Sequence, residues 1–307
     1  MMSTVVVTVI CLVAVLVALY RLVKLQPATR EANYLSATML CYGLGKLART
    51  PVVTDDWIDG WVHSWSGVWN VTDFSGMALA ATGAIFLLYA VTSIFGRPLP
   101  GWLLPGSIGV AVGGMAVAFA LSPVPDAPTA YMSRDFDMTG WLALYWLIYL
   151  ACLGNASATV AVLSGRASAV FQPGVPRAAM RAVSSAGSFG TLYVAHKVVN
   201  LLAEHFDVWQ WYSGVAPQIS LVTLACAILS GAVALLLMLS PVVGRRIGRY
   251  RMLRDRVQDW RASHVQNPDV ALDQALVPTD SRWSLWKASQ DPVVAHRMLV
   301  ELADVKG

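Results

Sequence analysis

Long apolar segments recur along the chain and are separated by short polar connections. A helix needs about 20 apolar residues to cross the hydrocarbon core of a bilayer. Segments that meet this length cover about residues 4–22, 32–50, 71–95, 102–122, 140–163, 181–203 and 217–241. The pattern therefore predicts an all-α integral membrane protein, in which residues 1–241 form a seven-transmembrane-helix bundle.

Composition agrees with this fold class. Only 13% of the 307 residues are charged and 56% are hydrophobic, whereas soluble domains carry about 25% charged residues. The formal net charge of +4 is modest and comes largely from arginines next to predicted spans. We therefore expect the lipid bilayer, with an anionic inner leaflet, as the partner, and no nucleic acid.

The distribution of Lys and Arg predicts the orientation, because cytoplasmic segments of membrane proteins are enriched in these residues. With the N-terminus outside, the outer connections hold only Arg49 and Arg134. The inner segments hold thirteen basic residues, namely Arg21, Lys24, Arg30, Arg97, Arg166, Arg177, Arg181, Arg245, Arg246, Arg249, Arg251, Arg254 and Arg256. We expect a multi-pass plasma-membrane protein with an extracytoplasmic N-terminus and a cytoplasmic C-terminus.

Tryptophans spaced four residues apart follow the second predicted span. This spacing keeps side chains on one face of a helix, and Trp is enriched at the membrane–water interface. We predict a short interfacial helix over about residues 55–69, anchored by Trp57, Trp61, Trp65 and Trp69. An aromatic platform for a lipid or another amphipathic ligand is the alternative.

Polar stripes occupy the outer halves of the second and sixth predicted spans, and Tyr145 and Tyr149 enter the fifth. Residues three or four apart share a helical face, and a charge inside the membrane normally faces a partner or water. The stripes and the acid that opens the third span comprise Lys46, Arg49, Asp73, Tyr193, His196, Lys197, Asn200 and Glu204.

Two interpretations of these stripes are open. The slightly favoured one is a network of ion pairs and hydrogen bonds that fixes helix packing, with Asp73 as a candidate partner of Lys197. The other is an outward-opening polar cavity that attracts an anionic group. There, Asp73 and Glu204 balance charge or carry a proton, and His196 titrates near neutral pH.

Small residues mark places where helices can approach closely. The fourth span contains Gly109-x-x-x-Gly113, which favours a contact inside the bundle over an oligomer face. The sixth span opens with the weakly apolar run AVSSAGSFG. We expect that helix in the middle of the bundle.

Residues 242–307 form a basic tail that we expect to be cytosolic and partly helical. Its apolar positions Ile247, Tyr250, Leu253, Val257 and Trp260 are spaced for one helical face. Inner-leaflet contacts are expected from Arg245, Arg246, Arg249 and Arg254. A docking surface for a protein partner is the alternative. Near the end, we expect Asp291 to cap a last short helix.

Recognisable catalytic, cofactor and metal motifs are missing from the sequence. The four cysteines lie in apolar runs without ligand spacing and are expected to be buried thiols. The last span has no lysine for a retinal Schiff base. We predict no catalytic residue, no cofactor and no metal site, and we lean against an enzyme. An intramembrane enzyme would have only Asp73, His196, Glu204 and His205 available.

Three stretches carry a resemblance to known proteins. They are ALYRLVKLQPATREANYLSATM, ARTPVVTDDWID ahead of VWNVTDFSG, and SRWSLW followed by DPVVAHRMLVELAD. Together they resemble a family of actinobacterial multi-pass membrane proteins of unknown function, often labelled transporters. The resemblance covers most of the chain and implies the same topology in an actinobacterial plasma membrane. It carries over no binding or catalytic residues.

The polar stripes favour a transporter of a small solute or lipid, or an accessory subunit of one. The alternative is a membrane sensor or scaffold that signals through the basic C-terminal tail to a cytosolic partner. A homo-oligomer is compatible with both functions.

Overall fold

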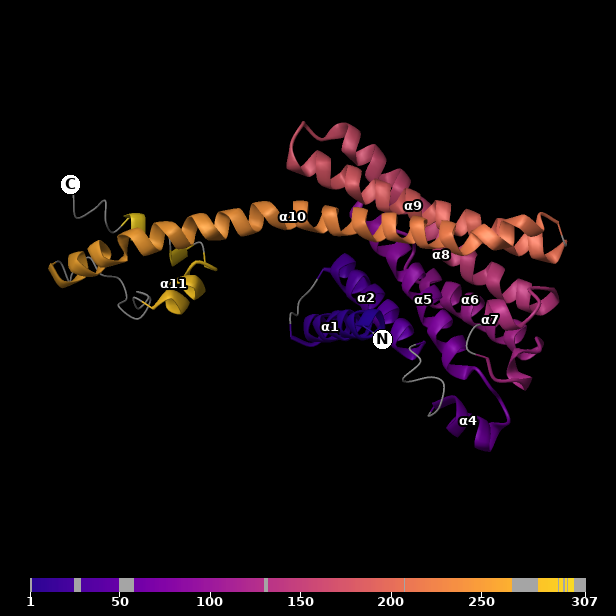
Figure 1. Cartoon of the computed structure of the whole chain (residues 1–307). Coiled ribbons are helices and arrows are strands. Elements are labelled where there is room, and N and C mark those ends of the chain that lie inside the picture. The colour runs from indigo at the N-terminus through magenta and orange to yellow at the C-terminus, as the bar shows by residue number, and fades with distance from the viewer. Residues whose placement is uncertain are drawn as a thin grey trace. The chain divides into compact units, whose positions relative to one another are not determined.

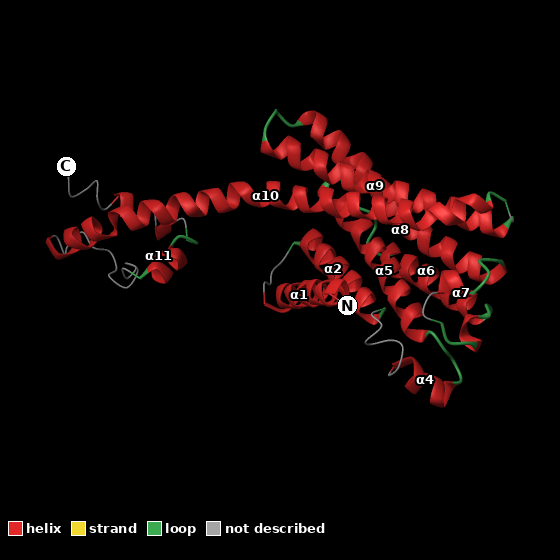
Figure 2. Ribbon diagram, in the orientation of Figure 1, coloured by secondary structure: helices red, strands yellow, loops and turns green. Residues whose placement is uncertain are grey.

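The computed structural model describes residues 2–24, 29–49, 58–129, 132–206, 208–266 and 281–291, and most of 293–300. Over these residues the protein is built from helices and the turns that join them, without strands (Figures 1 and 2). This confirms the all-α prediction. The chain divides into two compact units, Met1–Ala234 and Leu235–Gly307.

The first unit is a bundle in which each helix packs on the next in a fixed order. Helix α1 packs on α2, α2 on α5, α5 on both α6 and α8, α6 on α8, and α8 on α9. The helices are α1 (Met2–Lys24), α2 (Arg30–Ala48), α4 (Asp59–Ser66), α5 (Val71–Ile94), α6 (Leu103–Ala120), η2 (Val124–Asp126), α7 (Met132–Asp135), α8 (Gly140–Val170), α9 (Val175–His205) and the start of α10 (Gln210–Gln266).

Among the described residues, four helical stretches are long and apolar enough to cross a membrane, which fits an integral membrane protein. They are Val71–Ile94, Leu103–Ala120, Gly140–Val170 and Gly214–Met238, matching the third, fourth, fifth and seventh predicted spans. Helix α1 contributes a shorter apolar stretch, Cys11–Val23. Helices α2 and α9, which carry the polar stripes, do not meet the same measure. The count of seven and the orientation stay predictions.

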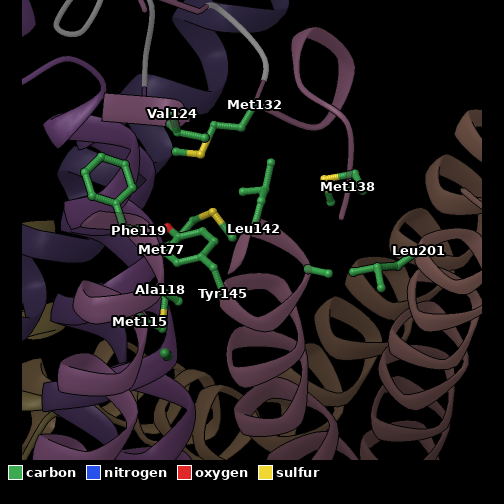
Figure 3. Packing of buried hydrophobic residues seen from close by; sticks show 12 residues of the cluster. Met77, Met115, Ala118, Phe119, Val124, Met132, Met138, Leu142, Tyr145 and Leu201 are labelled. Carbon is green, nitrogen blue, oxygen red and sulfur yellow. The ribbon is translucent and has the colours of Figure 1, made fainter. Parts of the chain in front are cut away.

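The largest apolar core lies where α5, α6 and α8 meet (Figure 3). Met77, Met115 and Leu142 are fully buried there, and Phe119 and Tyr145 fill the space between the helices. Alanines on α5 and α6 let the helices approach closely. This core lies directly below the loops that connect the helices at the end where α2 and α9 finish, which is the predicted outer end.

The second unit contains the rest of α10 and α11 (Arg282–Ala288), and the tail packs on itself as expected. Part of the predicted apolar face forms a buried core, made of Leu253, Val257, Trp260, Leu285, Val294 and Met298. Ile247 is an exception, since 37% of it is exposed. Asp291 Oδ1 accepts a hydrogen bond from Val293 N at 2.8 Å, which confirms the cap.

Helix α10 extends beyond both bounds of the seventh predicted span, about residues 217–241. It begins at Gln210, ends at Gln266 and includes Pro217 and Pro241. Proline is tolerated inside long membrane helices when neighbouring groups or small adjustments satisfy the freed backbone carbonyl. The same helix therefore continues from the predicted span into the tail.

Candidate functional site

A close approach of α2 and α5 positions the first member of the site. A Cβ atom on Gly45 would lie 2.6 Å from the carbonyl oxygen of Gly76, so the two backbones nearly touch. A Cβ on Gly76 would lie 2.7 Å from Cδ of Arg49. The aliphatic stem of Arg49 therefore lies over Gly76, where any side chain would displace it.

Arg49 pairs with Asp73 across the contact between α2 and α5. Its Nε donates to Asp73 Oδ1 at 2.9 Å, and the two side chains are 37% and 17% exposed. Asp73 lies in the first turn of α5, where the free N–H groups of the helix also favour an acid. The suggested pairing of Asp73 with Lys197 is therefore wrong, because the Gly45–Gly76 contact brings Arg49 to Asp73 first.

Tyrosines from α8 and α9 surround the pair. Tyr145, Tyr149 and Tyr193 all interact electrostatically with Arg49. Tyr145 is fully buried, with its ring centroid 6.3 Å from that of Phe119 (Figure 3). The sequence indicated that Tyr145 and Tyr149 enter the fifth span but gave no sign that they surround Arg49.

Three buried polar atoms near this end of α8 and α9 have no hydrogen-bond partner among the described residues: Tyr145 Oη, Trp146 Nε1 and Asn200 Oδ1. The contact of Gly154 with Val194 sets the antiparallel register of α8 and α9 and places Asn200 near the level of Tyr149. A buried polar group left unpaired costs about 1–3 kcal/mol. We call Arg49, Asp73, Tyr145, Trp146, Tyr149, Tyr193, Lys197 and Asn200 the polar cluster.

Lys197 is the second cation of the polar cluster. Its Nζ lies 6.0 Å from the centroid of the Tyr193 ring. Within the described part of the chain, no carboxylate lies within 4.0 Å of it. The nearby acid Glu204 instead accepts a hydrogen bond from Asn200 Nδ2 at 2.7 Å. The predicted stripe thus exists, but it leaves Lys197 without a close carboxylate.

His196 lies outside the polar cluster and joins α9 to α10. Only 5% of it is exposed, and its Nε2 lies 2.9 Å from both Ala216 O and Ser220 Oγ. A carbonyl can only accept, so the neutral ring carries its proton on Nε2 and its Nδ1 accepts from the Tyr212 hydroxyl. The placement of His196 in a polar cavity is therefore wrong, since its hydrogen bonds hold two helices together.

Lys46 is exposed and interacts electrostatically with Cys11 of α1. Of the eight residues predicted to share a cavity, the structure gathers Arg49, Asp73, Tyr193 and Lys197. Asn200 and Glu204 continue the stripe toward the end of α9.

The tryptophan helix ends earlier than predicted. Helix α4 ends at Ser66 because Gly67 adopts the left-handed conformation, with φ of 72°. Trp61 and Trp65 share its exposed face, each 67% exposed, with ring centroids 5.9 Å apart. Trp69 lies beyond the helix and stacks on His63 with centroids 4.0 Å apart. Trp57 lies outside the described residues. Interfacial anchoring by these tryptophans stays a prediction.

Two residues that sequence reasoning missed hold the loops above the polar cluster. Asp59 Oδ1 accepts from Thr72 N at 2.9 Å and so caps α5. The side-chain amide of Asn70 donates to Val124 O at 2.7 Å and to Ala127 O at 2.8 Å. A buried Asp or Asn in a connection is the signal for such loop-closing bonds, but its partners depend on tertiary structure.

The tail arginines have contacts inside the second unit. The Arg246 guanidinium lies 4.0 Å from the Trp286 ring centroid, and Arg249 Nε donates to Ser289 O at 2.8 Å. Arg254 pairs with Asp255 at 2.8 Å, and Arg245 is exposed. Their contact with the inner leaflet stays a prediction, with Arg245 the freest of the four among the described residues.

An apolar groove of about 660 Å³ lies along α5, α6 and α8. Its lining is apolar except for Ser107, Cys152 and Asn155. Over the described residues, no group of His, Cys, Asp and Glu could hold a metal ion.

Comparison with known proteins gives no match to a protein family, to a curated protein or to a solved structure. The resemblance to actinobacterial membrane proteins therefore stays a prediction.

Proposed function

We propose that this protein is a plasma-membrane transporter of a small solute, or an accessory subunit of one, and that the polar cluster is its solute site. The observation that carries the proposal is the set of unpartnered atoms among the described residues, Tyr145 Oη, Trp146 Nε1 and Asn200 Oδ1, of which Tyr145 interacts electrostatically with Arg49 and Asp73. In the predicted N-out, C-in orientation, this set lies in the outer half of the bundle.

The proposal follows from the free-energy cost of leaving buried polar atoms without hydrogen bonds in the solute-free protein. A packed membrane core offers them no water, and each unmet donor or acceptor is unfavourable. A residue kept only for packing would serve better without its polar atom. A solute with matching groups satisfies these atoms when it binds, which explains why polar side chains occupy these positions.

The test is Tyr145→Phe, with Tyr89→Phe as the matched control. Both tyrosines are buried on neighbouring helices, but Tyr89 packs on Tyr34 outside the polar cluster. We expect Tyr145→Phe to leave the thermal stability of the solute-free protein unchanged or raised, because the hydroxyl has no partner to lose. Solute-induced stabilisation and uptake into proteoliposomes should fall about tenfold or more, as for a lost hydrogen bond to a charged group.

Equal solute responses in Tyr145→Phe, Tyr89→Phe and wild-type protein contradict the proposal. A fall in the stability of solute-free Tyr145→Phe also argues against it, since that hydroxyl would then have a structural partner.

A sensor or scaffold is the second candidate function. The buried core of the second unit favours it, because Leu253, Val257 and Trp260 give the tail a defined fold that a cytosolic partner could recognise. Deletion of residues 262–307 removes part of this core. Full activity of the shortened protein would exclude signalling through the tail, whereas loss of activity with normal membrane insertion would support it.

A further inference from the structure

We infer that the solute of the polar cluster is a small anion bearing a carboxylate or phosphate group. Until this anion binds, the Asp73 carboxylate occupies its position on Arg49. This inference rests on the proposed function. It concerns which chemical class the site accepts and how the site is kept occupied in the absence of solute.

The unpartnered groups of the polar cluster are mainly donors. Trp146 Nε1 can only donate, and the Tyr145 hydroxyl is free to donate because it has no partner. Arg49 has five N–H groups, of which Nε–H is bonded to Asp73. Lys197 has no carboxylate within 4.0 Å among the described residues. A group that offers several acceptor oxygens complements such a set.

Charge selects among acceptors. The pair of Arg49 and Asp73 is neutral as a whole, and Glu204 acts electrostatically on Lys197 without a contact within 4.0 Å. The planar guanidinium of Arg49 can bind a carboxylate or phosphate through two parallel hydrogen bonds, which suits such a group better than a neutral or cationic one. Lys197 adds a second cationic donor.

Unpartnered Asn200 Oδ1 is the exception to this donor set. It can accept from a hydroxyl or ammonium group elsewhere on the same anion. A hydroxy acid, an amino acid or a protonated phosphate therefore fits better than a bare halide. This acceptor lies on α9, apart from Arg49 on α2, so the solute must be large enough to contact both helices.

The contacts of Asp73 allow a solute anion to displace it from Arg49. Its carboxylate contacts Arg49 through Nε at 2.9 Å, and 37% of the Arg49 side chain is exposed. The Arg49 stem is held over Gly76, so the guanidinium keeps its place when its partner changes. Released Asp73 stays in the first turn of α5, where the helix N-terminus stabilises its charge. The solute anion replaces the Asp73 carboxylate on Arg49. Because one ion pair is exchanged for another, the net gain in binding free energy is small and the solute can dissociate.

The experiment uses the full-length protein in phosphatidylcholine nanodiscs. Its thermal unfolding midpoint is measured against acetate, lactate, succinate and inorganic phosphate, with glycerol and choline as neutral and cationic probes at equal ionic strength. We expect at least one anion to raise the midpoint and both other probes to leave it unchanged. Arg49→Gln should remove the response, whereas Arg97→Gln, an exposed arginine in the same unit, should keep it.

Asp73→Asn tests the exchange. If Asp73 occupies Arg49 nine-tenths of the time, removing its charge should tighten anion binding about tenfold. Asp73→Ser, which also favours a helix N-terminus, serves as a second variant if the first folds poorly. Asp126→Asn is the matched control, because Asp126 is exposed and lies outside the polar cluster. Unchanged or weaker anion binding in both Asp73 variants overturns the exchange.

A further arm identifies the source of the anion. If the protein is stabilised by phosphatidylglycerol nanodiscs in an Arg49-dependent manner, and soluble anions compete, the anion is a lipid headgroup. If only soluble anions act, it is a free solute. A response to glycerol or choline that Tyr145→Phe abolishes keeps the proposed function and overturns the anion inference. No response to any anion, free or lipid-borne, also overturns it.

Discussion

Glycines on α9 and on α6 have opposite surroundings, although both helices are rich in the small residues associated with close helix contacts. A Cβ on Gly187 of α9 would lie 2.6 Å from Ala161 N and 2.8 Å from Ser157 O on α8. A Cβ on Gly109 or Gly113 of α6 would meet nothing within 4 Å. Small residues therefore mark a surface that another helix can approach, and the rest of the helix decides whether one does.

Larger side chains decide the orientation of α6. Its buried face consists of Ala111, Met115, Ala118 and Phe119, which pack into the core against α5 and α8. With this face buried, Gly109 and Gly113 point away from the bundle. The contact inside the bundle favoured by their spacing is therefore wrong, and the oligomer face is the alternative that stays open.

Gly187→Ala should have the largest effect on stability, because Gly187 lies against the backbone of α8. The new methyl group would collide with backbone atoms of α8, which cannot rotate away, so the helices must separate. We expect a loss of about 1–3 kcal/mol in the free energy of unfolding. Thermal or denaturant unfolding of the purified protein in detergent measures it. A change below about 0.5 kcal/mol, the usual range for surface substitutions, would show that α8 and α9 pack less closely than described.

This contrast also shows what the sequence could reveal. The bounds of α5 and α6 were predicted to within two residues, because length and hydropathy are local properties. Helix α8 begins where predicted but ends seven residues later, and α10 runs past both bounds of the seventh span, because hydropathy marks the apolar stretch and not the ends of the helix. The Arg49–Asp73 pair depends on the contact between Gly45 and Gly76, which no single stretch of sequence specifies.

The same limit applies to α9. Its helical period correctly placed Tyr193, Lys197, Asn200 and Glu204 along one stripe. The expectation that it lies in the middle of the bundle is wrong, because over the described residues α9 packs mainly on α8, whereas α5 and α8 each pack on several helices. The period could not say that the neighbouring His196 faces Tyr212 and Ser220 of α10, because that depends on where a later helix returns.

Gly76→Ala should have the next largest effect, about 1–2 kcal/mol of unfolding free energy, because part of the collision is with a flexible side chain. The new methyl would displace Arg49 and also press on Gly45 O, 2.7 Å away. Arg49→Ala together with Gly76→Ala should recover some but not all of the loss. A full recovery, measured by the same unfolding experiment, would mean that the two backbones do not touch.

Ser184→Ala should have a smaller effect. Ser184 Oγ donates to Ala161 O on α8 at 2.8 Å, and hydrogen bonds between membrane helices contribute about 0.6 kcal/mol on average. We expect a loss of this order in the unfolding free energy. Ser188→Ala is the matched control, because the Ser188 hydroxyl bonds only to Ser184 O within its own helix. Equal losses in both variants would remove the interhelical bond as the cause.

Gly109→Ala should have the smallest effect on the isolated chain and is the sharpest test of the comparison. The methyl group meets open space, and alanine favours a helix over glycine by up to about 1 kcal/mol, so stability should stay the same or rise slightly. Gly109→Leu should also be tolerated, since leucine is as apolar as the lipid around it. A large loss of stability in detergent monomers would show that α6 hides this face within the bundle. If a homo-oligomer forms through this face, Gly109→Leu should dissociate it, as sedimentation or crosslinking would detect, while the monomer stays folded.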